Sequence, residues 1–262
     1  MIPAPPPPPL RHPPALRLVD VACRRGERLL FAGLHETLAP GELLWLRGGN
    51  GRGKTSLLRL VAGLAAPERG RILWGDAPVR RNASFQRDLV YVAHANALKD
   101  DLTAAEALAF LARVHGRDAS PEAVRGALAR FGLASRERAP VRSLSQGQRR
   151  RVALARLALA PEPGLWVLDE PFDSLDIGAT TTLHEVIDGH RARGGSVLLT
   201  SHHLPLSVDA AGHPLPPPRT LDLDAHVAGR PAPAAPTAAP SAPEAGSVPP
   251  SASDAGRAPS TE

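Results

Sequence analysis

The chain of 262 residues contains one cysteine, two lysines and nine aromatic residues, and it has no long uninterrupted apolar run. Cys23 has no second cysteine to pair with, so an intramolecular disulfide is excluded. Charges or prolines interrupt every hydrophobic stretch before the roughly 18 residues that a membrane-spanning helix needs. The first residues also lack the basic segment and apolar run of a secretory signal. We therefore expect a cytoplasmic protein that reaches a membrane only through a partner.

Aromatic residues are missing from both ends of the chain, where proline is concentrated. All aromatics lie between Phe31 and Phe172, whereas eight of the 29 prolines lie in residues 1–14 and thirteen lie from Pro205 onward. Segments without large apolar side chains cannot offset the entropy lost on ordering. We predict a Pro-rich disordered arm over 1–15, one folded domain over 16–225, and a disordered Pro/Ala/Ser-rich tail over 226–262.

The formal charge of +5 permits nucleic-acid binding, but the arginines are scattered and no basic face with base-stacking aromatics is evident. We therefore expect no nucleic-acid partner.

Nearly all cationic residues are arginine, so a lysine at a particular position indicates a particular role. Lys54 and Lys99 are the two lysines.

Residues 48–55 fit the P-loop pattern G-x-x-x-x-G-K-[ST] without a mismatch. Residues 42–47 predict a strand entering the loop, and residues 55–62 repeat apolar side chains at helical spacing. In such a loop, backbone N–H groups surround a phosphate chain and the lysine ammonium reaches the terminal phosphates. A plain Gly-rich turn is the alternative interpretation. The nucleotide-binding residues that we expect are Gly48, Gly49, Asn50, Gly51, Arg52, Gly53, Lys54, Thr55 and Ser56, with Thr55 also on magnesium.

A second candidate half-site follows the apolar run at residues 165–168, which predicts a buried parallel strand. The run ends in Asp169 and Glu170, so both carboxylates are expected at the carboxyl edge of the sheet. Beside a P-loop, Asp169 would orient magnesium through water and Glu170 would polarise the hydrolytic water. A solvated pair of surface acids is the alternative.

Upstream, Ser145 and Gln148 have the spacing of a capping box before a run of strong helix formers over 149–160. An ordinary helix start explains these two residues, but it leaves Gly147 unexplained. A glycine in a first helical turn costs stability, yet it lets an anion approach the backbone at the positive end of the helix dipole. Gly147 therefore indicates that an anion could approach the start of this helix.

Taken in order, these motifs resemble those of the ATP-binding cassette (ABC) ATPases, whose signature is Leu-Ser-x-Gly-Gln. Residues 174–176 resemble that family's D-loop, which places Asp176 near a subunit interface, and His202 matches its switch histidine after a strand at 196–200. The resemblance implies ATP and Mg²⁺ as ligands, and a homodimer in which the signature of one subunit closes over the ATP of the other. Ser145, Gly147 and Gln148 of the signature would then contact the phosphates. His203 directly follows His202, and adjacent side chains at a strand end point to opposite sides, so His203 would point away from the nucleotide.

The fold class implied is α/β, a P-loop NTPase of ABC type with a mostly parallel sheet core. It would include N-terminal antiparallel strands at about 16–23 and 27–38, a helical signature subdomain over 102–160 that begins with a Thr103–Glu106 capping box, and an edge strand at 219–223.

Two features depart from the general ABC pattern. His94 stands where the family has a glutamine that touches magnesium, and its imidazole could hold a metal-bound water. The family usually has an adenine-stacking aromatic near the N-terminus of the domain, but the corresponding segment, residues 23–26, contains none, and Arg25 could stack there through its planar guanidinium. His94, residues 98–103, Trp166 and His190 together resemble the heme exporter ATP-binding subunit of bacterial cytochrome c maturation.

That second resemblance implies integral membrane permease subunits as partners, heme or a heme chaperone as the indirect cargo, and a location on the cytoplasmic face of the inner membrane. Lys99 would lie in the loop that faces the membrane subunits. Two other classes stay open: an ABC ATPase that energises a different permease, and a soluble ABC ATPase that acts on nucleic acid or ribosomes.

Overall fold

The computed structural model describes residues 13–160, 162–202 and 218–226, all within one compact unit, Met1–Ala232. Most of the predicted arm, His203 and the predicted tail after residue 226 lie outside the described residues. At the beginning of the described chain, Pro13 is buried and the Gly75 N–H donates a hydrogen bond of 2.9 Å to the Ala15 carbonyl.

Five parallel strands form the central sheet in the order β6-β7-β8-β3-β9. Every residue of β7 and β8 is buried, which is why their sequences are nearly continuous apolar runs. The predicted strands of the P-loop, the Asp-Glu pair and the switch histidine are confirmed, as is the predicted edge strand. The strands are β3 (Leu43–Arg47), β6 (Leu89–Val92), β7 (Leu165–Leu168), β8 (Ser196–Thr200) and β9 (Arg219–Asp222).

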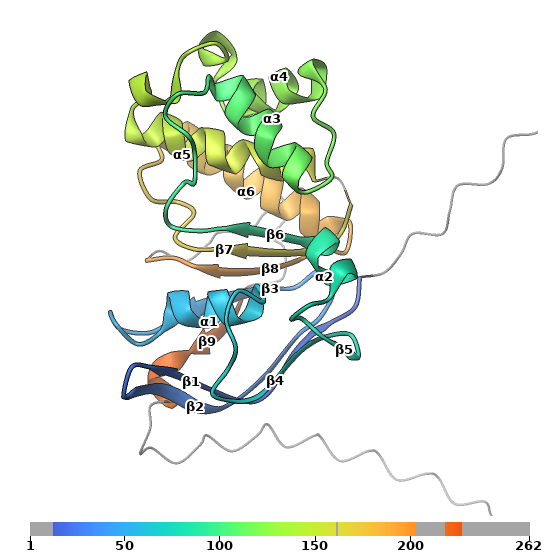
Figure 1. Cartoon of the computed structure of the whole chain (residues 1–262), viewed down its shortest axis with the longest axis vertical. Coiled ribbons are helices and arrows are strands. Elements are labelled where there is room, and N and C mark those ends of the chain that lie inside the picture. Colours follow the sequence, from blue (N-terminus) through green and yellow to red (C-terminus); the bar gives the residue numbers. More distant parts are fainter. Residues whose placement is uncertain (1–12, 161, 203–217, 227–262) are drawn as a thin grey trace, which may run out of the picture. The chain divides into compact units, whose positions relative to one another are not determined.

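A second sheet is antiparallel, in the order β2-β1-β4-β5. It contains the two N-terminal strands expected from the sequence, and it adds two strands that no sequence pattern predicted. The helix α1 (Lys54–Val61) contributes four leucine and valine side chains to the core cluster shared by the two sheets, and it lies between them in Figure 1. The strands are β1 (Leu16–Arg25), β2 (Arg28–Leu38), β4 (Arg69–Trp74) and β5 (Ala77–Pro78).

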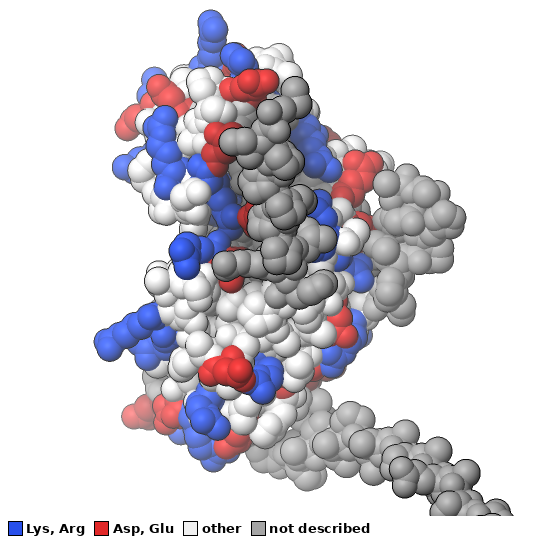
Figure 2. All heavy atoms as spheres, turned by 90° about the vertical axis from the view of Figure 1, so that its right-hand side faces the viewer, with Lys and Arg blue, Asp and Glu red and all other residues white. Residues whose placement is uncertain are grey.

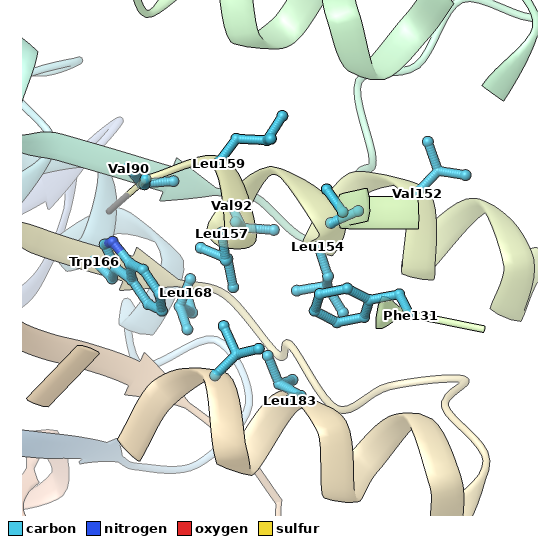
Figure 3. Packing of buried hydrophobic residues seen from close by; sticks show 14 of the residues in the cluster. Val90, Val92, Phe131, Val152, Leu154, Leu157, Leu159, Trp166, Leu168 and Leu183 are labelled. Atoms are coloured by element: carbon cyan, nitrogen blue, oxygen red, sulfur yellow. The ribbon is translucent and has the colours of Figure 1, made fainter. Parts of the chain in front are cut away.

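Helices cover the other face of the parallel sheet. Figure 3 shows Val92, Trp166 and Leu168 of the sheet packed toward residues of the helical segment over 102–160 and of α6, in one continuous apolar cluster. Thr103 and Ser145 both form the capping boxes expected from their spacing. The helices on this face are α3 (Ala104–Val114), α4 (Pro121–Arg130), α5 (Gln146–Ala155) and α6 (Ile177–Ala192), with the 3₁₀ turns η1 (Ala134–Arg136) and η2 (Val141–Ser143) between α4 and α5 and η3 (Arg156–Leu159) after α5. The short helix α2 (Ala83–Asp88) and the 3₁₀ turn η4 (Leu223–His226) instead place Phe85 and Leu223 in the core cluster shared by the two sheets.

The segment over 102–160 is therefore largely helical, as expected. Of the helices that the structure describes, none has the length and apolar character needed to cross a bilayer.

Candidate nucleotide-binding site

The carboxyl ends of β3, β6, β7 and β8 meet at one edge of the parallel sheet, which is where ligands bind in open α/β sheets. A cleft of about 470 Å³ lies there, within the size range of small-molecule sites. Segments from five parts of the chain line it. The lining residues are Arg25, Arg28, Leu30, Gly49, Asn50, Gly51, Gly53, Lys54, Thr55, Ser56, His94, Asp169, Glu170, Asp173 and His202.

The P-loop enters the cleft between β3 and the first turn of α1. Gly51 and Gly53 have φ angles of 74° and 101°, in the left-handed region that side chains other than glycine rarely adopt. Gly53 is also the N-terminal cap of α1, so the loop delivers its N–H groups at the positive end of that helix. The Lys54 ammonium donates a 2.8 Å hydrogen bond to the Gly48 carbonyl across the loop.

The P-loop is held from outside the cleft by Asp224 of η4. One carboxylate oxygen of Asp224 accepts a 2.9 Å hydrogen bond from the Gly49 N–H, and the other lies 2.7 Å from the Arg52 Nε. Gly48 and Arg52 do not line the cleft. The motif did not reveal Asp224, because its contact depends on the parallel pairing of β9 with β3.

Thr200, at the end of β8, positions the Asp-Glu pair. Its hydroxyl donates to Asp169 Oδ1 at 2.9 Å and accepts a hydrogen bond from the Glu170 N–H at 2.8 Å. Thr200 is fully buried, so water does not compete for either bond. In the sequence Thr200 is only part of a predicted strand, and its role follows from the neighbouring positions of β7 and β8.

The surroundings of Glu170 suit its carboxyl group to accept a proton. Burial raises the pKa of its carboxyl group above the ordinary value, and the nearby Asp173 and Asp169 act in the same direction, against opposing effects of His202 and Lys54. A raised pKa brings a carboxylate closer to the value suited to general-base catalysis. The His202 Nε2 lies 3.7 Å from Glu170 Oε1, so the two predicted catalytic groups face each other.

The backbone before His202 is anchored by Trp45 of β3. Its indole N–H donates a 3.0 Å hydrogen bond to the Ser201 carbonyl. This contact joins residues 156 positions apart in the chain, and sequence spacing gave no signal for it.

The cleft contains oxygen atoms suited to magnesium. Asp169 is only 2% exposed, and its Oδ2 accepts no hydrogen bond from the described residues. The Thr55 side chain lines the same cleft. A carboxylate and a hydroxyl are hard ligands of the kind that Mg²⁺ prefers, so these two residues fit that ion. His94 also lines the cleft, and its Nδ1 lies 3.9 Å from Asp173 Oδ2.

The predicted signature residues Ser145, Gly147 and Gln148 do not line this cleft, and neither does Asp176. Ser145 and Gln148 satisfy each other in the capping box of α5, with hydrogen bonds of 3.2 and 3.0 Å. Asp176 caps α6 by accepting a 2.8 Å hydrogen bond from the Ala179 N–H.

Gly147 has a steric role within this chain. A Cβ added there would lie 2.6 Å from the Ser174 carbonyl oxygen, which is closer than real Cβ contacts come. Ser174 itself has a φ of 63°, so the D-loop turn has little freedom to retreat. Glycine at position 147 therefore allows the signature helix to contact the D-loop directly.

Two residues that marked the subfamily in the sequence, Trp166 and His190, stack on each other. Their ring centroids are 3.8 Å apart and their planes differ by 7°. The His190 Nε2 lies 3.1 Å from the Gly164 carbonyl oxygen. Gly195 packs so closely against the imidazole that any Cβ there would collide with it. These residues form one packing unit at the amino ends of β7 and β8, the edge of the sheet opposite the cleft.

A P-loop, an Asp-Glu strand end and a capped signature helix arranged on one parallel sheet define an ATPase of the ATP-binding cassette class. The family model "ABC transporter" matches residues 31–173. A putative ABC transporter ATP-binding protein from Pyrococcus furiosus shares the fold, with a TM-score of 0.67 at 19% identity, over 81% of this chain and 99% of that one.

More similar relatives define the subfamily. The cytochrome c biogenesis ATP-binding export protein CcmA of Aromatoleum aromaticum is 47% identical over 82% of this chain and 97% of its own length. The protein of the same name from Methylococcus capsulatus is 47% identical over 69% of this chain and 87% of its own length. The chain belongs to this family of cytochrome c biogenesis ATP-binding export proteins.

Proposed function

We propose that this protein is the ATP-hydrolysing subunit of the heme exporter complex of c-type cytochrome biogenesis. Family membership supports the biological role, and the convergence of the P-loop, Asp169, Glu170 and His202 on one cleft supports the chemistry. ATP hydrolysis in this site would drive heme export or the release of a heme-loaded chaperone.

Each side chain of the cleft has a proposed part in hydrolysis. Backbone N–H groups of the P-loop and the Lys54 ammonium would bind the phosphates, and Thr55 and Asp169 would hold Mg²⁺, which neutralises charge on the phosphate oxygens. Glu170 would accept the proton of the attacking water, and His202 would orient that water and the γ-phosphate.

The nucleobase would lie toward the hairpin between β1 and β2. Arg25 and Arg28 both line the cleft beside Leu30, and no aromatic residue is among the lining residues. A planar guanidinium can stack on a purine ring, so we propose Arg25 or Arg28 as the base-stacking residue.

We further propose a homodimer that places the signature of one subunit on the phosphates of the other. Ser145 and Asp176 are exposed outside the cleft of their own chain, and Ile177 beside them is 88% exposed. Ser145, Gly147 and Gln148 would then bind the γ-phosphate of the partner subunit's ATP through the positive end of α5.

Membrane permease subunits are the second proposed partner, and they would hold the protein on the cytoplasmic face of the inner membrane. A mostly apolar hollow of about 550 Å³ lies between the ends of α1 and α3, where Leu64 and Val114 are 60% and 63% exposed. Nearby, the Lys99 ammonium lies 5.5 Å from the ring centroid of the exposed Phe110. An exposed apolar surface of this kind supports a protein partner.

Replacing the proposed base provides the test of the chemistry. Glu170→Gln keeps the size of the side chain but cannot accept a proton, so we expect ATP binding to persist while turnover falls by about two orders of magnitude or more. Glu185→Gln on the exposed face of α6 is the matched control, with turnover unchanged. Near-normal hydrolysis by Glu170→Gln would show that another group is the base.

The biological role is tested in a strain that lacks the gene. Complementation with the wild type and with Glu185→Gln should restore covalent heme staining of c-type cytochromes, whereas Glu170→Gln should not. Normal staining in the deletion strain would remove the heme assignment and favour a different permease.

On the face drawn in Figure 2, basic and acidic side chains are interspersed, which gives no support to a nucleic-acid partner.

A further inference from the structure

The Arg150 side chain donates five hydrogen bonds next to the cleft, although it does not line the cleft itself. It lies on α5, two residues after Gln148 of the signature, and is 3% exposed. Burial lowers the pKa of its guanidinium, while Asp173, Asp169 and Glu170 oppose that effect. A charge taken out of water at this cost needs compensating bonds.

One nitrogen of the guanidinium binds the loop after β6. Nη1 donates to the Ala93 carbonyl at 2.9 Å, to the His94 carbonyl at 3.4 Å and to Asn96 Oδ1 at 3.1 Å. This loop carries His94 into the cleft, so Arg150 determines where the backbone of His94 lies relative to α5.

The other nitrogen binds the backbone of the Asp-Glu pair. Nη2 donates to the Asp169 carbonyl at 2.8 Å and to the Glu170 carbonyl at 2.7 Å. Glu170 has a φ of 46°, which is unfavourable for a residue with a side chain, so its conformation must be held by its surroundings. Thr200 holds the N–H of Glu170 and Arg150 holds its carbonyl.

We propose that Arg150 is a positioning residue that couples the signature helix and the loop over residues 93–96 to the proposed base, Glu170. A shift of α5 or of that loop moves the guanidinium, and the guanidinium moves the carbonyl of Glu170. Hydrolysis then proceeds only when both segments are in place. The inference rests on the proposed function of Glu170 and adds a route by which the two segments control it.

The planar guanidinium of Arg150, with its two terminal nitrogens, makes this link possible. One guanidinium reaches five oxygens on two strand ends, whereas a lysine ammonium at the same position has a single nitrogen for both. Arg150→Lys therefore keeps the charge and loses the bridge, and Arg150→Gln loses both.

The test compares these variants with Arg156→Gln in the full-length protein. Arg156 follows α5 directly and also donates to a backbone carbonyl of β6, that of Tyr91, but it has no contact with the cleft. Thermal unfolding, the dissociation constant for a non-hydrolysable ATP analogue, and kcat and KM for ATP are measured for each protein.

For both Arg150 variants we expect kcat to fall about tenfold to hundredfold, as for a catalytic group displaced by a fraction of an ångström to one ångström, while the dissociation constant stays within about threefold. Arg156→Gln should lower the melting temperature and leave kcat per folded molecule within about twofold of wild type. A kcat near wild type for either Arg150 variant, or an equal loss in Arg156→Gln, would overturn the proposal.

A double-mutant cycle with Asn96→Ala tests the coupling itself. Asn96 touches the guanidinium but not Glu170, so its loss should lower kcat less than Arg150→Gln does and add nothing once Arg150 is replaced. Fully additive losses would refute the coupling. If Glu170→Gln abolishes turnover and Arg150→Gln does not, this inference fails and the assignment of Glu170 stands.

Discussion

His190 should make the stability of this protein fall in mildly acidic solution. The imidazole is fully buried, stacks on Trp166 and has its Nε2 3.1 Å from the Gly164 carbonyl oxygen. Desolvation by burial lowers the pKa of His190 to about 4. The folded protein therefore keeps this side chain neutral at pH values where the unfolded chain binds a proton.

The sign and the size follow from that difference. Because the folded-state pKa is depressed, the contribution is complete above the unfolded pKa of about 6.5 and is lost as the pH falls toward about 4. Linkage gives a loss of about 2 kcal/mol in the free energy of unfolding between about pH 7.5 and pH 5. For a small domain of marginal stability this is a large fraction of the total.

The assay is urea unfolding at a series of pH values, followed by tryptophan fluorescence. His190→Phe retains an aromatic ring on Trp166 but cannot titrate, so its stability should fall by about 2 kcal/mol less than that of the wild type over the same interval. His115 and His184 also have lowered pKa values, but they are present in both proteins and cancel in the comparison. Parallel pH profiles for the two proteins would refute the reasoning.

Two further substitutions test close contacts around the site. Gly147→Ala should lower ATP turnover at least about tenfold, because the new methyl group forces the Ser174 carbonyl away, whereas Gly126→Ala in α4, which has open space around it, should be neutral or stabilise the helix by about 0.5–1 kcal/mol. Equal turnover for the two variants would contradict the steric argument. Asp224→Ala should weaken ATP binding several-fold in an equilibrium titration, since it releases the Gly49 N–H of the P-loop. An unchanged dissociation constant would show that the loop is held without this carboxylate.

Local sequence was sufficient for the elements whose signals are contained in a few neighbouring residues. The capping boxes at Thr103 and Ser145 depend only on side chains three positions apart, and both form as expected. The buried strands β7 and β8 are uninterrupted apolar runs bounded by polar residues. The antiparallel pair β4 and β5 was missed, because β5 is only two residues long and offers no period.

Some residues of the candidate site were predicted from the sequence and others were not, because only some of them belong to a local motif. Motifs identified Lys54, Asp169, Glu170 and His202, and the cleft brings these four residues together. No motif identified Thr200, which bonds to Asp169 from the neighbouring strand. Such residues carry no pattern of their own, since their role depends on which strand lies beside which.

The sequence by itself determined the class of protein, because the P-loop and the strand that ends in two carboxylates are each formed by consecutive residues. It also contained Trp166, His190 and Gly195 as separate features without a relation between them. Only the tertiary structure decided that these three pack together, that Gly147 lies against Ser174, and that one guanidinium joins three segments at the base of the site. Contacts between residues far apart in the chain arise from strand order and helix packing, which a linear pattern does not encode.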